Sequence, residues 1–264
     1  MSIAFRVDSS KEIGSGHLYR CLNLANSLKE SGFNCIFLIN KKNYKISKLV
    51  KSNGHSLKFL SIKDEVVKSK KIDVHKQWLK HTWQDDAKAT IDFLKKNFTS
   101  FLVVDHYSLD YRWERKVKRY TRKVMVIDDL DNRKHECDVL LDHNYRSENN
   151  AYKKNIINNF CKKLLGLEYL IINKEYRNYK KTYSRGYIKN ILIFFGGSDS
   201  ENLTKLILKK LIKLDSKKYN VSIIIGINNN KIKSIEKLTK NLNNFQCYNT
   251  QPNLASILKK NDLV

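Results

Sequence analysis

Polar residues that can hold or move a proton follow four successive apolar runs of the sequence. The first run leads into Asp8, and the later ones lead into Asp105-His106-Tyr107, Asp128-Asp129 and Asp142-His143-Asn144. Ligands of open parallel sheets bind outside the carboxyl ends of the strands. A lone aspartate at a strand end is usually a turn former or a helix cap, but its repetition at four ends favours one shared site.

The segment Gly14-Ser15-Gly16-His17 opens the first predicted helix and brings a histidine to its first turn. Glycines let the backbone approach a ligand closely, and a helix N-terminus offers free N–H groups to an anion. A cation is disfavoured there, so we expect His17 to be the neutral imidazole that a general base requires. A histidine that only caps the turn fits the same spacing. Tyr19 replaces the third glycine of the dinucleotide fingerprint, so we predict no nicotinamide or other cofactor.

A second glycine-rich segment, Gly196-Gly197-Ser198-Asp199, also follows an apolar run. It suits the diphosphate or the sugar of a nucleotide sugar, and a tight turn between strand and helix is the alternative interpretation. Gly226, after the next apolar run, repeats the pattern in a weaker form.

Short β-branched runs alternate with amphipathic segments along the chain, which predicts an α/β fold with parallel sheets and helices on both faces. The predicted strands are Ile3–Val7, Cys35–Ile39, Leu57–Leu60, Phe101–Val104, Val124–Ile127, Val139–Leu141, Ile191–Phe195, Val221–Ile225 and Phe245–Tyr248. The predicted helices are Leu18–Leu28, Ile46–Val50, a helix capped near Asp85, Leu203–Leu214, Ile232–Leu242 and Leu254–Lys259. We predict a crossover at Leu164–Ile172.

The charged, tyrosine-rich tract 174–189 interrupts this alternation. We interpret it as a linker between an N-terminal Rossmann-like domain, residues 1–173, which carries the base, and a partial C-terminal one, residues 190–264. The second domain would bind the nucleotide.

The composition of the chain limits the classes of protein to which it can belong. No apolar stretch reaches the roughly 20 residues of a membrane span, and Met1–Asp8 lacks a signal-peptide pattern, so we expect a cytoplasmic protein without a membrane partner. The five cysteines are scattered, which is typical of reduced core residues. The net charge of +25 comes from lysines spread along the chain. Such a field favours an anionic substrate, and without a basic stripe we expect no nucleic-acid partner.

Several motifs together resemble the UDP-2,4-diacetamido-2,4,6-trideoxy-β-L-altropyranose hydrolases of pseudaminic acid biosynthesis. They are Gly14-x-Gly16-His17-x-x-Arg20-Cys21-Leu22-x-Leu24-Ala25, Trp83-Gln84-Asp85-Asp86-Ala87, Val103-Val104-Asp105-His106-Tyr107-x-Leu109-Asp110 with Trp113-Glu114, Val126-Ile127-Asp128-Asp129-Leu130, Leu165-Gly166-x-Glu168-Tyr169 and Phe194-Phe195-Gly196-Gly197-Ser198-Asp199. The resemblance covers nearly the whole chain. It implies a glycosyltransferase-B type fold, with the sugar site on the N-terminal half and UDP held mainly by the C-terminal half.

The resemblance also implies a metal-independent reaction in which water attacks the anomeric carbon with inversion and UDP leaves. His17 matches the family's base, and Tyr107 matches a tyrosine that assists. The expected substrate-binding residues are Asp8, Gly14, Gly16, Arg20, Asp105, His106, Asp128 and Asn144, and the expected UDP-binding residues are Gly196, Gly197, Ser198 and Gly226. The sequence departs from the family pattern at Asn173, where the family often has an arginine. Flagellin or a surface polysaccharide would be the final acceptor of the glycan.

The last residues, Asn261–Val264, resemble the opening of the strand that precedes the family's glycine-rich UDP-sugar segment. We therefore expect an incomplete second domain, whose final strand lies beside Phe245–Tyr248, and a chain with weakened UDP binding.

Three other functions compete with the hydrolase. A glycosyltransferase or epimerase of the same fold would use His17 on an acceptor hydroxyl. A metallohydrolase would gather a divalent ion among Asp105, His106, Asp128, Asp129 and His143, and a basic RNA-binding module would use the net charge.

Overall fold

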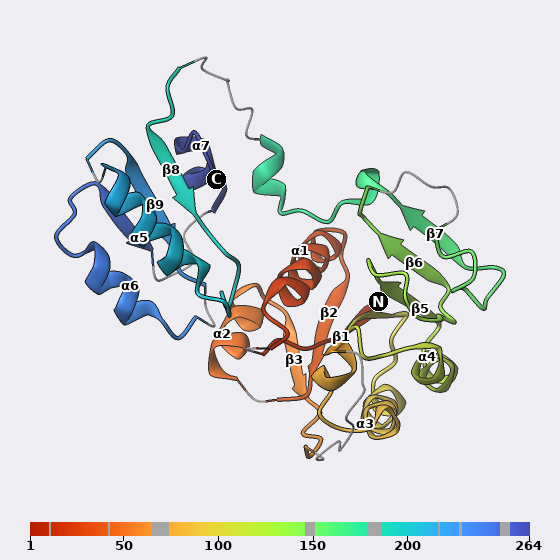
Figure 1. Cartoon of the computed structure of the whole chain (residues 1–264). Coiled ribbons are helices and arrows are strands. Elements are labelled where there is room, and N and C mark those ends of the chain that lie inside the picture. The colour runs from red at the N-terminus through yellow and green to blue at the C-terminus, as the bar shows by residue number, and fades with distance from the viewer. Residues whose placement is uncertain are drawn as a thin grey trace. The chain divides into compact units, whose positions relative to one another are not determined.

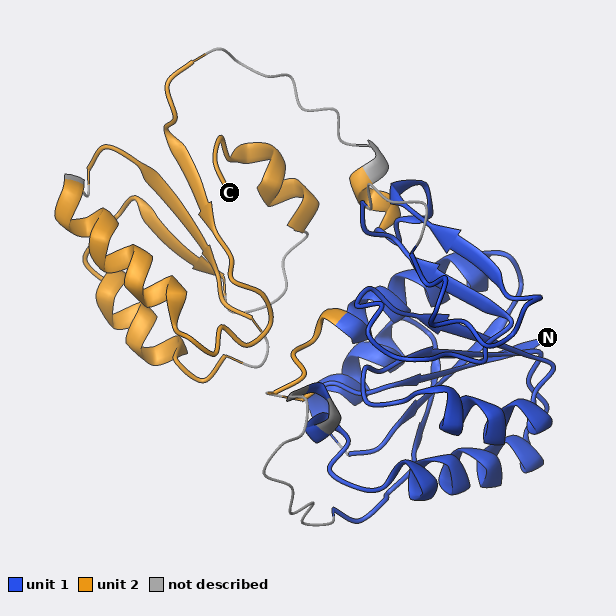
Figure 2. Cartoon of the chain, turned by 45° about the vertical axis from the view of Figure 1, so that its right-hand side comes forward, with its two compact units in different colours: residues 1–9, 17–172 blue, residues 10–16, 173–264 orange. Residues whose placement is uncertain are grey.

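The computed structural model describes the chain except residues 11, 42, 65–73, 146–150, 179–185, 216, 227–228 and 249–253. The expected linker, residues 174–189, thus lies partly outside the described residues. The described part forms two compact units, residues 1–9 with 17–172 and residues 10–16 with 173–264 (Figures 1 and 2). Each unit contains a parallel sheet, and each is described by itself.

The described strands of unit 1 form a parallel sheet in the order β3-β2-β1-β4-β5-β6-β7. Their bounds are β1 Ser2–Val7, β2 Asn34–Ile39, β3 Ser56–Phe59, β4 Phe101–Asp105, β5 Lys123–Ile127, β6 Val139–Asp142 and β7 Lys162–Leu165. After β3 the chain returns to the other side of β1. The gap between the carboxyl ends of β1 and β4 is therefore the point at which ligands bind in such sheets.

Helices cover both faces of this sheet (Figure 1). Helices α1 (Gly16–Glu30) and α2 (Tyr44–Ser52) pack on one face, and α3 (Trp83–Lys96) and α4 (Tyr111–Val117) pack on the other. Successive side chains of β1 point to opposite faces of the sheet. Phe5 packs in the core beneath α1 and α2, and Ala4 packs in the core beneath α3 and α4. Short 3-10 turns complete the unit: η1 Val74–Trp78, η2 Lys118–Tyr120 and η3 Leu167–Tyr169.

Unit 2 has a smaller parallel sheet in the order β10-β9-β8 among the described strands. Its elements are the 3-10 turn η4 Lys174–Asn178, the strands β8 Asn190–Ile193, β9 Asn220–Ile224 and β10 Phe245–Tyr248, and the helices α5 Leu203–Asp215, α6 Ile232–Thr239 and α7 Leu254–Lys260. One face packs against α5 and α6 and the other against α7.

The structure corrects several predicted boundaries. A further strand, β7, overlaps the start of the crossover predicted at Leu164–Ile172, and the fourth helix, α4, was not predicted. Helix α3 begins two residues before Asp85 and is capped by Thr82, whose Oγ1 accepts a hydrogen bond from the N–H of Asp85 at 3.1 Å. Strand β8 ends at Ile193, so it does not include the half-exposed Phe195.

The position expected for the last residues is also wrong. Leu263 forms a parallel bridge with Ile191 of β8, so these residues lie beside β8 and not beside β10. Among the described helices, none combines the length and the apolarity that crossing a bilayer requires. All five cysteines are free, and the thiols of Cys137 and Cys161 lie 3.6 Å apart.

Candidate active site

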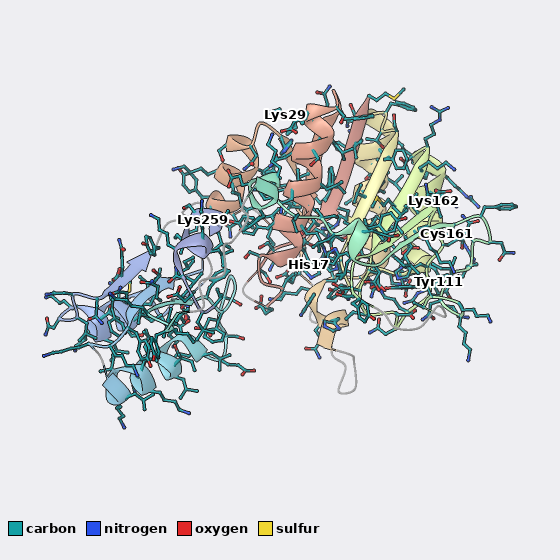
Figure 3. All side chains as sticks on the ribbon, turned by 90° about the horizontal axis from the view of Figure 1, so that it is seen from above. His17, Lys29, Tyr111, Cys161, Lys162 and Lys259 are labelled. Atoms are coloured by element: carbon teal, nitrogen blue, oxygen red, sulfur yellow. The ribbon has the colours of Figure 1, made fainter. Side chains whose placement is uncertain are left out.

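The first turn of α1 places His17 at the carboxyl edge of the unit 1 sheet. Figure 3 shows His17 and Lys29 at opposite ends of this helix. Leu18, Cys21 and Leu22 anchor the helix in the core, so the direction of the His17 side chain is set by packing. The imidazole is 8% exposed. A side chain in this position can meet a ligand at the sheet edge while most of its ring is held by protein atoms.

Asp105, at the end of β4, hydrogen-bonds the imidazole. Its Oδ1 lies 2.6 Å from Nδ1 of His17, and the carboxylate is 1% exposed. Burial alone would raise the pKa of Asp105, but the charges and hydrogen bonds of His17 and Arg20 lower it to about 2. An ionised carboxylate in this position can accept a proton from Nδ1, and in a neutral ring that arrangement leaves the lone pair on Nε2. This is the tautomer that a general base requires.

Arg20, one turn along α1, connects two strand ends. It donates to Asp105 from Nη2 at 2.7 Å and from Nε at 2.8 Å, and to Asp129 from Nη1 at 3.0 Å. Two hydrogen bonds to one carboxylate fix its orientation as well as its charge. Arg20 thus holds Asp105 in the orientation in which it meets His17.

Tyr107 packs edge-on against the imidazole. The two ring centroids are 4.5 Å apart with an interplanar angle of 83°, and the Tyr107 hydroxyl donates to Asp129. The guanidinium of Arg133 lies 5.4 Å from the centre of the tyrosine ring. Burial and the hydrogen bond to Asp129 raise the pKa of Tyr107, so the phenol remains protonated at neutral pH. It can donate a hydrogen bond but cannot serve as the base.

Two aromatic residues of η1 complete the surroundings of His17, and the sequence did not predict them. The Trp78 ring lies 5.8 Å from that of His17 and stacks on Tyr107 at 5.5 Å. His75 contacts both Trp78 and Tyr107, at 4.7 and 5.2 Å between centroids. These rings follow no strand end and belong to no motif quoted above, so only their residue type could have suggested them.

Asp8 and His106 belong to a buried network on the same strand ends. Asp8 accepts from Nη2 of Arg6 at 2.7 Å and from the N–H of Asn40 at 2.8 Å, and Nε2 of His106 lies 3.3 Å from it. Arg6, which is 0% exposed, also pairs with Asp86. The predicted substrate residues Asp8 and His106 are therefore engaged with protein groups. An arginine inside an apolar strand was the available signal for this network.

Asp128 is likewise enclosed by its neighbours. Its carboxylate pairs with Arg133 at 2.7 Å, accepts from the N–H of Asp131 at 3.1 Å and lies 3.6 Å from Nε2 of His135. The opposite nitrogen of His135 lies 2.7 Å from Glu114. Burial lowers the pKa of His135, but the charges of Glu114 and Asp128 outweigh it and raise this pKa to about 9. Asp128 thus anchors the loop behind Tyr107.

Asn144 is exposed, and its side-chain amide donates to the carbonyl of Asp129 at 3.2 Å. Of the residues predicted to bind substrate, the structure thus gathers Arg20 and Asp105 around His17, and Asn144 contacts the adjoining Asp129. Asp129 lies at the centre of this arrangement; the sequence placed it at a strand end of the shared site but not among the substrate-binding residues.

The predicted glycines differ in backbone conformation and in the space around them. Gly14 has a φ of 80°, a conformation that favours glycine, and an added Cβ at Gly16 would meet no described atom within 4 Å. After β8, Gly196 has a φ of 71°, and an added Cβ at Gly226 would collide with the backbone of Gly196 and Gly197. The loops after β8 and β9 therefore touch backbone to backbone. Ser198 is half-buried beside Asp199, which accepts hydrogen bonds from the first turn of α5.

Within the described ranges, no three His, Cys, Asp or Glu side chains are grouped as a metal ion would require. The carboxylates that a metallohydrolase would use are paired instead, Asp105 with Arg20 and Asp128 with Arg133.

No family model matches the chain. It is similar to an uncharacterised protein of Methanocaldococcus jannaschii, with 26% identity over all of this chain, and it spans 51% of that protein's length. It is also similar to the UDP-2,4-diacetamido-2,4,6-trideoxy-β-L-altropyranose hydrolase of Campylobacter jejuni, with 25% identity over 99% of this chain and 83% of that one.

The structure is also similar to that of a glycosyltransferase from Rickettsia africae. The TM-score is 0.54 and the sequence identity 12%, and the match covers 99% of this chain and 72% of that one. This likeness confirms the predicted fold class, an α/β fold of glycosyltransferase-B type with two Rossmann-like sheets.

Proposed function

We propose that this protein hydrolyses a UDP-sugar, with His17 as the base that activates water. The observation that carries the proposal is the 2.6 Å contact between Asp105 and Nδ1 of His17 at the carboxyl edge of the sheet. Similarity to the Campylobacter jejuni hydrolase over 99% of the chain supports the same chemistry. We propose the substrate in that protein's name, UDP-2,4-diacetamido-2,4,6-trideoxy-β-L-altropyranose, for this protein too.

In this mechanism a water molecule lies against Nε2 of His17. Among the described residues, none hydrogen-bonds this nitrogen, so its lone pair can accept a proton from the water. The hydroxide that forms attacks the anomeric carbon from the face opposite the UDP oxygen, and the configuration inverts as UDP leaves. Asp105 stabilises the imidazolium that results, because its carboxylate is ionised and fixed by Arg20.

In this mechanism Tyr107 keeps the His17 ring in its orientation. Its ring holds the imidazole edge-on, and Asp129 fixes its hydroxyl. Asp129 is in turn held by Arg20, so one arginine orders both partners of His17. We assign UDP to the glycine-bearing loops of unit 2, at Gly196, Gly197, Ser198 and Gly226. Gly196 has a φ of 71° and is exposed, and a glycine-rich turn of this kind can offer backbone N–H groups to a diphosphate.

The same site could serve a glycosyltransferase or an epimerase, in which His17 would deprotonate a hydroxyl group of a sugar. The products separate these activities. The full-length protein, incubated with the UDP-diacetamido sugar alone and followed by NMR, should release UDP and free sugar in equal amounts. A transferase would leave the UDP-sugar intact until an acceptor is added, and an epimerase would give a new UDP-sugar or glycal signals.

A further inference from the structure

The rings around His17 form a continuous aromatic surface. Trp78 stacks on Tyr107 with an interplanar angle of 25°, stands edge-on to His17 at 75°, and contacts His75. Trp78 is only half-buried, so part of this residue is accessible to solvent, and its ring lies 5.8 Å from that of His17. The two other tryptophans lie elsewhere: Trp113 is 0% exposed in the core, and Trp83 contacts Arg112 and Lys116.

The backbone on both sides of Trp78 is anchored. Leu79 is buried in the core cluster of α3 and α4, and His81 bonds Asp86 at 2.9 Å and Asn40 at 3.2 Å. On the other side, the Ser108 hydroxyl donates to the carbonyl of His75. Because these contacts fix η1, the indole is held in place before any ligand arrives. A preformed aromatic surface binds with little loss of conformational entropy.

We propose that Trp78 determines which sugar this site accepts, by packing its indole against the apolar groups of the sugar beside His17. This inference rests on the proposed function, because it takes the UDP-sugar as the ligand. A diacetamido-trideoxy sugar presents methyl groups and C–H edges where common hexoses present hydroxyl groups. Burial of those groups against an indole is favourable, whereas a hydroxyl placed there would lose its hydrogen bonds to water.

Titration calorimetry tests this assignment with UDP, UDP-glucose and the UDP-diacetamido-trideoxy sugar as probes, and every protein carries His17→Leu so that the last probe is bound but not cleaved. With Trp78 present, the last should bind more tightly than UDP-glucose. Trp78→Ala should remove most of this preference, on the order of tenfold, and leave the affinity for UDP unchanged. Trp78→Phe should keep part of it. Trp83→Phe is the matched control and should behave as the wild type.

Two results would overturn the inference: an unchanged preference in Trp78→Ala, or an equal loss of affinity for all three probes, which would indicate a purely structural tryptophan. If Trp78→Ala does not fold, fluorescence decides. In Trp83→Phe protein the diacetamido sugar nucleotide should change the tryptophan emission and UDP should not, and identical spectra with both would refute the contact. A failure of the proposed hydrolysis would be detected separately, in the NMR assay. Free sugar would then be absent from the wild type as well as from the variants at position 78.

Discussion

At the scale of single residues, His17 is held by groups of different kinds. Asp105 hydrogen-bonds Nδ1, Tyr107 and Trp78 pack against the ring, and Arg20 fixes Asp105. An imidazole confined in this way is held in one orientation, so the loss of turnover from each substitution should depend on which contact it removes.

Asp105→Asn should lower turnover by about a hundredfold or more with a smaller change in KM. The amide is neutral, so it stabilises the imidazolium less and also loses the charge that Arg20 pairs with. Steady-state kinetics on the purified variant give both constants. Asp64→Asn, at a half-exposed ion pair with Lys41, is the matched control and should leave both unchanged. Near-normal turnover in Asp105→Asn would remove Asp105 from the mechanism.

Tyr107→Phe should reduce turnover less than any change at His17 or Asp105. The phenylalanine ring keeps the 4.5 Å contact with the imidazole, and only the hydroxyl that donates to Asp129 is lost. The same kinetic assay measures the effect. A loss as large as that of Asp105→Asn would mean that the hydroxyl itself takes part in the chemistry.

The residues predicted from the sequence are those at strand ends and in short motifs, where position along the chain determines position in space. His17, Arg20, Asp105 and Tyr107 are of this kind, and the structure brings them together. Trp78 could not be predicted, because η1 has no periodic pattern and reaches the site through tertiary contacts of Leu79 and His81. The buried pairing of Arg6 with Asp86 was missed for the same reason, since it joins residues 80 positions apart.

At the scale of elements, long apolar runs predicted their strands to within one or two residues, because burial on both faces leaves a clear pattern. Strand β7 was missed since it begins with two exposed lysines, Lys162 and Lys163, and lies at the edge of the sheet. Helix α4 is only 7 residues long, which is too short for a helical period to appear.

The loop between β5 and β6 is held by the buried ion pairs of His135. The pKa of this imidazole is raised from its ordinary value near 6.5 to about 9, so its stabilising contribution is complete below pH 6.5 and disappears as the pH rises through 9. The free energy of unfolding should therefore fall by on the order of 3 kcal/mol between pH 6.5 and 10.

Denaturant unfolding across this pH range measures that loss, and His135→Gln should abolish most of it while being less stable at pH 7. His55→Gln serves as the control, because burial lowers the pKa of His55 and keeps its titration below this window. Parallel curves for the wild type and His135→Gln would show that the buried imidazole carries no charge.

At the scale of the whole molecule, the alternation of strands and helices predicted the α/β class and the parallel sheets. The order of strands within each sheet could not be predicted, because parallel neighbours are joined through distant crossovers. The pairing of Leu263 with β8 is an example, since its partner Ile191 lies 72 positions earlier in the chain. A solved glycosyltransferase contains similar sheets, so the similarity is one of fold.

The net charge of +25 should attract the anionic substrate without taking part in the chemical step. Screening at physiological ionic strength reduces such fields to about 8 Å, so we expect KM for the UDP-sugar to rise with salt while kcat stays constant. Single-stranded RNA retained at low salt should be released at 0.15 M, which a filter-binding titration measures. Retention of RNA at that salt concentration would favour the nucleic-acid function instead.

The central claim is that His17 activates the water that cleaves a UDP-sugar. The most direct measurement follows UDP and free sugar by NMR after mixing UDP-2,4-diacetamido-2,4,6-trideoxy-β-L-altropyranose with the full-length wild type and with His17→Leu. We predict that the wild type releases free sugar of inverted anomeric configuration without any acceptor. His17→Leu should bind the same ligand and turn it over on the order of a hundredfold or more slowly. Near-normal turnover by His17→Leu, or no free sugar from the wild type, would contradict the claim.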